Sequence, residues 1–158
     1  YVQTSQYTVR AQNMSDALIQ GAEVAARLTF GKRFLAVGNY TFTRAIDTGP
    51  NPSTHGKVIP GRPEHEFNVN AKWTEAWRPW ISSELFAEWQ FLSGNYLDAQ
   101  NLTSVRSRSL VSVGAAATFC KGIRLAMVTR NLLNERVSDL VGYPLPGRSY
   151  WGTMTVTW

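Results

Sequence analysis

The chain has 158 residues, enough for one domain, and its single cysteine, Cys120, excludes an internal disulfide and argues against a zinc site. Charged residues make up only 17% of the chain, and no run of about 18 apolar residues occurs, which excludes a transmembrane helix. The net charge of +5 comes from scattered lysines and arginines, a pattern that argues against a nucleic-acid partner.

The hydrophobic pattern predicts eight β-strands. Alternate side chains of a strand point to opposite faces, and several segments place an apolar residue at every second position. No long segment shows the period of a helix. The predicted strands cover residues 1–10, 17–30, 34–44, 65–73, 80–92, 108–119, 123–132 and 149–158. We therefore expect an all-β protein of antiparallel strands.

The early strands differ in clarity. The segment 1–10 has no clear apolar face, whereas the segment 17–30 separates its apolar residues from its charged ones. One face of the latter strand holds Leu18, Ala22, Val24, Ala26, Leu28 and Phe30, and the other holds Glu23, Arg27 and Thr29. The strand at 17–30 is therefore expected to lie between an apolar and a polar environment.

The middle strands alternate cleanly. In the strand 65–73, Phe67, Val69, Ala71 and Trp73 oppose Glu66, Asn68, Asn70 and Lys72. In the strand 80–92, Ile81, Leu85, Ala87, Trp89 and Phe91 oppose Ser82, Glu84, Phe86, Glu88 and Gln90. In the strand 108–119, Val111, Val113, Ala115, Ala117 and Phe119 share one face. One apolar and one polar face are thus expected across the whole sheet.

The last strand also separates two faces. Its apolar face holds Tyr150, Met154, Val156 and Trp158, and its hydroxyl face holds Ser149, Thr153, Thr155 and Thr157, with Trp151 as the exception. The segment ends on an aromatic residue, whereas the termini of soluble domains usually fray into polar residues. This ending is typical of an outer-membrane barrel.

The predicted connections alternate between short and long from the second strand onward. The short ones are 31–33, 74–79 and 120–122, and the long ones are 45–64, 93–107 and 133–148. Transmembrane β-barrels have short periplasmic turns and long extracellular loops, so this alternation predicts such a barrel. Three-residue turns predict Phe30 opposite Phe34 and Phe119 opposite Ile123, with Gly122 in the left-handed conformation.

The two faces suit a membrane wall. The apolar rows carry no charge, and a charge there would cost about 2–4 kcal/mol near the bilayer midplane. The polar rows would line the lumen. Aromatic residues are expected to form two girdles at the membrane interfaces. The periplasmic girdle would hold Phe30, Trp73, Trp77, Trp80, Phe119 and Trp158, and the other Tyr40, Phe42, Trp89, Phe91, Tyr150 and Trp151.

Several segments resemble a known family. The run Asn131-Leu132-Leu133-Asn134, with Gly-Tyr-Pro-Leu-Pro-Gly-Arg at 142–148, resembles the last hairpin of TonB-dependent receptors, although Leu133 stands where the family commonly has Phe. The segments 13–23, 40–45 and 59–65 resemble three earlier strands and strand entries of that family, in the same order. The resemblance covers nearly the whole chain.

The resemblance implies a function and a set of partners. The family forms barrels of about 22 strands around an N-terminal plug and imports scarce ligands such as iron-siderophores, haem or cobalamin across the outer membrane of Gram-negative bacteria. Residues 1–158 would be the C-terminal barrel segment, without the plug, the earlier strands and the region that the TonB complex pulls. No signal peptide precedes Tyr1, so the chain would be processed or a fragment.

Few residues are candidates for a site. The resemblance implies that Met154, Val156 and Trp158 form a signal for the barrel-assembly machinery, which could capture the strand edge; interface anchoring by Trp158 is the alternative. A ligand role for Arg148, His55 or His65 competes with ordinary rim electrostatics and solvation, which we favour. No catalytic constellation, metal cluster or cofactor motif occurs, so no enzyme is predicted.

Two other architectures fit the pattern in part. Eight strands could close into a self-standing outer-membrane barrel with a structural or adhesion role. A soluble ligand-binding barrel is the other, although it has no reason to segregate loop lengths by end. The receptor segment predicts an open sheet in which the first and last strands do not pair, because both edges would await further strands.

Overall fold

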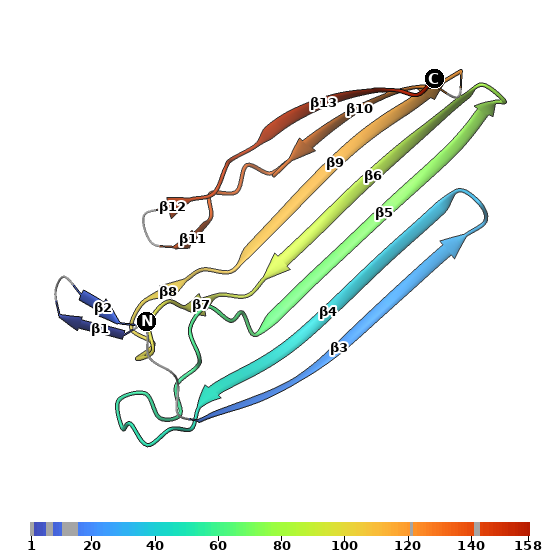
Figure 1. Cartoon of the computed structure of the whole chain (residues 1–158). Coiled ribbons are helices and arrows are strands. Elements are labelled where there is room, and N and C mark those ends of the chain that lie inside the picture. The colour runs from blue at the N-terminus through green and yellow to red at the C-terminus, as the bar shows by residue number, and fades with distance from the viewer. Residues whose placement is uncertain (1, 6–7, 11–15, 121, 141–142) are drawn as a thin grey trace.

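A computed structural model describes residues 2–5, 8–10, 16–120, 122–140 and 143–158. Over these residues, seven antiparallel strands form one open sheet in the order β13-β10-β9-β6-β5-β4-β3, which is a simple meander (Figure 1). The strands are β3 (Ala17–Phe30), β4 (Phe34–Asp47), β5 (His65–Arg78), β6 (Ile81–Leu92), β9 (Arg108–Phe119), β10 (Ile123–Arg130) and β13 (Ser149–Val156). The all-β antiparallel prediction is confirmed. None of the described residues forms a helix that could cross a membrane.

The prediction of one barrel strand over residues 1–10 is wrong. The segments β1 (Val2–Ser5) and β2 (Thr8–Arg10) form a separate hairpin that is not part of the large sheet. The sequence of residues 1–10 contains no apolar row that would fix a register against β3. Seven strands, rather than eight, therefore build the sheet in the part of the chain that the structure describes.

The remaining strands lie where they were predicted, and only some of them have different ends. The bounds of β3 and β9 agree with the predicted strands 17–30 and 108–119. The strand β4 runs on to Asp47 and β5 to Arg78, so the connection expected at 74–79 is much shorter. Backbone pairing with β6 extends β5 through its polar end, with a bulge between Ala76 and Arg78.

Loop lengths separate by end. The tight turns after β3, β5 and β9 lie at the end where the chain terminates, and the long connections lie at the opposite end (Figure 1). Two of these long loops contain small hairpins of their own. These hairpins are β7 (Asn95–Tyr96) with β8 (Ser104–Val105), and β11 (Ser138–Leu140) with β12 (Tyr143–Pro144). The predicted segregation of short and long connections is confirmed.

The predicted hairpin registers are confirmed. Phe30 lies opposite Phe34 across the first tight turn. Phe119 lies opposite Ile123 across the turn at 120–122. A slip of one residue would invert both faces of a strand, so these pairs keep the apolar rows of neighbouring strands on one side.

The conformation predicted for Gly122 is wrong. The left-handed residue of that turn is Cys120, with a φ of 50°, whereas Gly122 is not in that region. Gly122 is instead at a close approach, because an added Cβ would lie 2.7 Å from the carbonyl oxygen of Thr157. Its own carbonyl accepts a hydrogen bond of 2.8 Å from the Thr157 amide. The glycine thus lets the end of the chain pack against the turn.

Gly122→Ala is therefore expected to displace the last residues and to destabilise the final hairpin by about 1–3 kcal/mol, the usual cost of overpacking. Gly152→Ala on the same hairpin is the matched control, because no atom lies within 4 Å of an added Cβ there. Thermal unfolding of the two purified variants measures the difference. Equal stability would show that the close approach at Gly122 is not needed.

The sheet is a wall one layer thick. Only Ala45, Ala116 and Val137 are buried apolar residues among those described. Large apolar side chains are exposed instead, including Phe30 at 76% and Met127 at 71%. Such a wall needs an apolar medium on one side, because soluble proteins do not expose apolar surface of this extent.

The registers join the apolar rows of all seven strands on one face. Along this face, among the described strand residues, acidic and basic side chains lie only toward the ends: Arg44 and His65 toward the loops, and Glu75 and Arg78 toward the tight turns. The opposite face carries many more, namely Glu23, Arg27, Asp47, Glu66, Lys72, Glu84, Glu88, Arg108, Arg124 and Arg130. The expected separation into an apolar and a polar face is confirmed.

The sheet does not close on itself within the described residues. Its outer strands are β3 and β13, and neither pairs with the other or with the β1–β2 hairpin. This is the open sheet expected of a receptor segment. It gives no support to a self-standing barrel, whose first and last strands would pair.

Candidate functional site

Aromatic side chains gather at both ends of the apolar face. At the loop end, Phe67 packs against Trp89 with ring centroids 4.9 Å apart. At the turn end, Phe34 lies 6.4 Å from Trp73. One predicted girdle residue is misplaced: Trp151 lies opposite Val128 on the polar face, so its assignment to the lipid interface is wrong.

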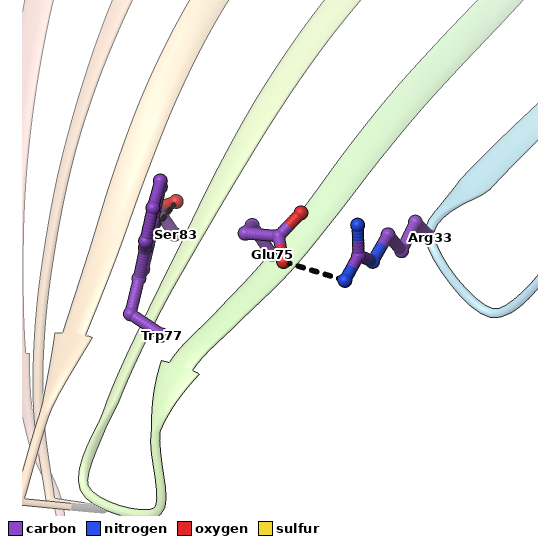
Figure 2. Close-up of polar contacts among 4 residues, drawn as sticks. All are labelled: Arg33, Glu75, Trp77 and Ser83. Carbon is purple, nitrogen blue, oxygen red and sulfur yellow. Dashed lines mark hydrogen bonds and ion pairs between the residues drawn. The ribbon is translucent and has the colours of Figure 1, made fainter.

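The polar residues at the turn end are paired. Figure 2 shows Arg33, from the turn after β3, reaching Glu75 on β5, with 3.1 Å between guanidinium and carboxylate. The same figure shows Trp77 over Ser83, and the indole N–H donates a 2.8 Å hydrogen bond to the hydroxyl. These pairs satisfy polar groups at the edge of the apolar face, where a membrane interface would lie.

The polar face carries an ion pair between neighbouring hairpins. Arg124 on β10 lies 2.6 Å from Glu84 on β6, and both side chains are partly exposed. The pair reaches across β9, which lies between these two strands. On an exposed surface such a pair contributes at most about 1 kcal/mol, so it orients charges rather than holding the sheet together.

Two loops are tied to each other. Asn101, in the loop 93–107, accepts a 2.8 Å hydrogen bond from the Val58 amide and donates one of 2.8 Å to the Val58 carbonyl. The Gly61 amide donates to the Tyr96 carbonyl at 2.8 Å. The side chain of Asn101 thus acts like a strand partner for the loop 48–64, and the two loops form one unit.

Asp98 shapes the second of these loops. Its carboxylate accepts hydrogen bonds from the amides of Gln100, Leu102 and Thr103. The Leu102 and Thr103 amides favour the ionised form and lower the pKa of Asp98 below the ordinary 3.8. The charged carboxylate therefore closes the turn that presents Asn101.

The third loop is held by Asn131, the one buried polar residue among those described. Its side-chain oxygen accepts a 2.8 Å hydrogen bond from the Glu135 amide. Its amide group donates to the carbonyl of Glu135 at 2.9 Å and to that of Pro146 at 3.3 Å. Asn131 thereby joins the two ends of the loop 131–148 to the end of β10.

Asn134 adds a second attachment. Its side-chain oxygen accepts a 3.0 Å hydrogen bond from the Arg148 amide. An added Cβ on Gly147 would lie 2.8 Å from the same oxygen, so a larger residue there would push the Asn134 side chain out of this position. Asn131 and Asn134 both have positive φ values, which asparagine tolerates better than most residues. The motif of two asparagines and Pro-Gly-Arg is therefore a loop latch, a role that the sequence analysis missed.

The three candidate ligand residues do not come together. Arg148 is exposed beside the latch, where β13 begins. His55 is exposed in the loop 48–64, and its Nδ1 lies 2.9 Å from the Gly49 carbonyl oxygen. His65 lies on the apolar face, with its Nδ1 2.9 Å from the Tyr40 hydroxyl and its ring stacked on the Tyr40 ring. No group of three or more potential metal ligands occurs in the described part of the chain.

Hollows lie at the loop end of the polar face. One, of about 370 Å³, lies between loops and is lined by Glu66, Arg106 and Arg108 together with small polar residues and apolar residues such as Leu92 and Leu97. Another, of about 530 Å³, lies beside the third loop and is lined by Glu88, Arg130 and Trp151 among others. Both are large enough for a small molecule or part of one.

The final strand is an open edge. Met154 and Val156 are exposed on the apolar face of β13, and Trp158 beyond it is fully exposed. The hydrogen bond between Thr157 and Gly122 places the end of the chain beside a tight turn. The three residues predicted as an assembly signal are thus accessible along an unpaired edge.

Comparisons with known proteins agree with this geometry. Residues 1–132 match the family described as TonB dependent receptor-like, beta-barrel. A search of curated protein sequences finds no match. Similar solved structures are the ferric yersiniabactin uptake receptor FyuA from Yersinia pestis (TM-score 0.72, 16% identity, 88% of this chain), the siderophore receptor PiuA from Acinetobacter baumannii (0.71, 16%, 89%) and BauA, the ferric preacinetobactin receptor from Acinetobacter baumannii (0.75, 18%, 89%).

The likeness to these structures is one of fold, because the identities are low. The present chain spans 22% of the length of each of the three structures. The matched region therefore corresponds to about a fifth of each of these longer proteins.

Proposed function

Because this chain belongs to the TonB-dependent receptor-like β-barrel family, we propose that it forms part of the barrel wall of an energised outer-membrane receptor. Members of this family are transport receptors of the Gram-negative outer membrane, and they work with a plug and with TonB. The observation that carries the proposal is the single-layered sheet, with one apolar face whose acidic and basic groups lie only at its ends and one charged face. Lipid would cover the first face, and a wet or plugged lumen would lie against the second.

The chain would be the C-terminal segment of a barrel of about 22 strands. Further strands of the same receptor would pair with the free edges of β3 and β13, because unpaired backbone groups are not tolerated in lipid. A plug and the region that contacts the TonB complex would belong to the rest of the receptor. The coverage of 22% of the similar structures supports this division.

The cargo would be a scarce ligand such as an iron-siderophore, haem or cobalamin. An iron-siderophore is favoured, because the similar structures are siderophore receptors by description. Arg148 and His55 lie on the loop side and are accessible to such a ligand. His65 is less suited, because its ring is engaged with Tyr40 on the apolar face.

An uptake assay tests this function. Cells that make the complete receptor are supplied with radiolabelled iron as a ferric siderophore, labelled haem or labelled cobalamin, and compared with cells that lack the receptor. Receptor-dependent uptake that stops when the proton-motive force is dissipated is expected for one of these ligands. A receptor present in the outer membrane that supports uptake of none of them would contradict transport of this ligand class.

We further propose that Met154, Val156 and Trp158 form the signal that the barrel-assembly machinery captures by strand addition. Their exposure along the free edge of β13 supports this role. Trp158→Ala in the complete receptor is then expected to reduce the amount assembled severalfold while leaving the ligand affinity of the assembled fraction unchanged. Surface-exposed receptor per cell and the affinity of purified receptor are the two measurements.

Trp80→Ala is the matched control for Trp158→Ala. Trp80 is an exposed tryptophan at the same turn end, but it precedes β6 and is not on the last strand. Assembly reduced equally by both substitutions would mean that Trp158 acts as an ordinary interface anchor. Normal assembly with lost affinity would place Trp158 in a ligand site instead.

A further inference from the structure

Lipid does not explain Trp151, which lies on the polar face of the sheet near the loops. It follows Tyr150 on β13 and therefore points to the opposite, polar face, where its neighbours along the strand are Ser149 and Thr153. Its side chain is 58% exposed, and its indole N–H donates a 3.2 Å hydrogen bond to the Ser149 hydroxyl. A large aromatic side chain exposed on the charged face of the sheet indicates that another molecule or another part of the receptor packs against it.

Arg130 lies against this tryptophan. Its guanidinium carbon is 5.6 Å from the centre of the Trp151 ring, a cation–π distance. Arg130 is the last residue of β10 and lies opposite Ser149, so the planar cation and the indole stand side by side where the third loop begins. The pair thus places an aromatic surface next to the guanidinium of Arg130, which carries one positive charge and five N–H donors.

The hollow beside this pair has mixed walls. Its volume is about 530 Å³, within the range of about 300–1,000 Å³ usual for small-molecule sites. Glu88 and Gln90 on β6 and Ser112 on β9 supply polar groups, and Leu110, Leu145 and Pro146 supply apolar surface. Apolar surface with a few polar groups is the composition of a ligand site.

The loop side of the hollow is held in place before any ligand arrives. Pro146 and Gly147 line the hollow, and the latch residues Asn131 and Asn134 attach this part of the loop to the end of β10. Rigid walls reduce the entropy lost on binding, so they favour tight and selective recognition.

We propose that this hollow binds an aromatic ring of the receptor's cargo, and that the cargo is therefore a ferric chelate bearing an aryl group. The inference rests on the proposed function and names the ligand class for it. The ring would stack on Trp151, and Arg130 would pair with oxygen anions attached to the ring. Glu88 and Gln90 would accept hydrogen bonds from amide or hydroxyl groups beside the ring.

Binding to the purified complete receptor tests the inference. The probes are iron(III) tris(catecholate), which has aryl rings, and iron(III) citrate, which is anionic without a ring. Trp151→Thr replaces the ring with a hydroxyl side chain like those of the neighbouring strand residues. We expect it to weaken catecholate binding by up to about tenfold, the usual contribution of one aromatic contact, and to leave citrate binding unchanged. Tyr150→Thr is the control, because it removes the adjacent aromatic residue from the opposite face.

Arg130→Gln provides a second variant where Trp151→Thr fails to assemble. It removes the cation with a side chain of similar reach and is expected to weaken catecholate binding as well. Catecholate binding unchanged in an assembled variant, or equally weakened in Tyr150→Thr, would overturn the inference. A wild-type receptor that does not bind the catecholate probe would also overturn the inference. The transport function would still be tested independently by the uptake assay with haem, cobalamin or ring-free siderophores.

The plug is the competing occupant of the hollow. If plug residues fill it, Trp151→Thr is expected to expose the plug to protease and to leave both binding affinities unchanged. That result would also overturn the proposed aryl site, and it would assign Trp151 to plug packing.

Discussion

Ala26→Lys in the complete receptor is expected to leave little assembled protein in the outer membrane, whereas Ala25→Lys is expected to assemble normally. The two alanines are neighbours near the middle of β3, and both are exposed. Ala26 lies opposite Gly38 on the apolar face, and Ala25 lies opposite Asn39 on the polar face. One and the same substitution therefore tests both faces of one strand.

The expected difference comes from the surroundings of each face. A lysine on the lipid side near the midplane costs about 2–4 kcal/mol, whereas a lumen-facing lysine lies in a wet and already charged environment. The measurement is the amount of folded receptor in outer-membrane fractions, expressed relative to the total amount of receptor in the cells. Loss of assembly with Ala25→Lys alone would reverse the assignment of the two faces.

Asn131→Ala is expected to open the loop 131–148. The side chain is buried and bonds to the amide and carbonyl of Glu135 and to the carbonyl of Pro146. Loss of these partly buried hydrogen bonds costs about 0.5–1.5 kcal/mol for each bond. Hydrogen exchange and limited proteolysis of this loop in the purified receptor are expected to increase strongly.

Two further variants separate the contributions of the latch. Asn131→Asp keeps the acceptor for the Glu135 amide but turns a carboxylate toward two carbonyl oxygens, so it is expected to open the loop as well. Asn51→Ala is the control, because Asn51 is an exposed asparagine whose side chain accepts hydrogen bonds from Ser53, within its own loop. Unchanged protection in Asn131→Ala would mean that packing, and not this side chain, holds the loop.

The latch matters for the proposed aryl site, because Pro146 and Gly147 line that hollow. A receptor with an open third loop should bind the catecholate probe more weakly while Trp151 and Arg130 are intact. The latch and the stacking pair can thus be examined separately, the first through loop protection and the second through binding.

Local patterns in the sequence determined most of the sheet. Strict alternation predicted the bounds of β3 and β9, the pairing of Phe30 with Phe34, and the separation of the two faces, because side-chain direction in a strand depends only on residue parity. Turn residues and loop lengths predicted the meander and its two different ends. The segment 1–10 was misread because it has no apolar row to set its register.

Contacts between residues distant in sequence were decided only by the tertiary structure. Gly122 lies close to Thr157, Asn101 bonds to Val58, and Asn131 bonds to Pro146. No local sequence pattern predicts these partners. The face on which Trp151 lies follows from its odd or even place in the strand, but its proposed role in ligand binding depends on Arg130 and on the loop that lines the same hollow. The sequence by itself therefore determined the wall and its two faces, because these rest on local periodicity. Only the fold decided the latches and the hollow, because these rest on where the loops meet.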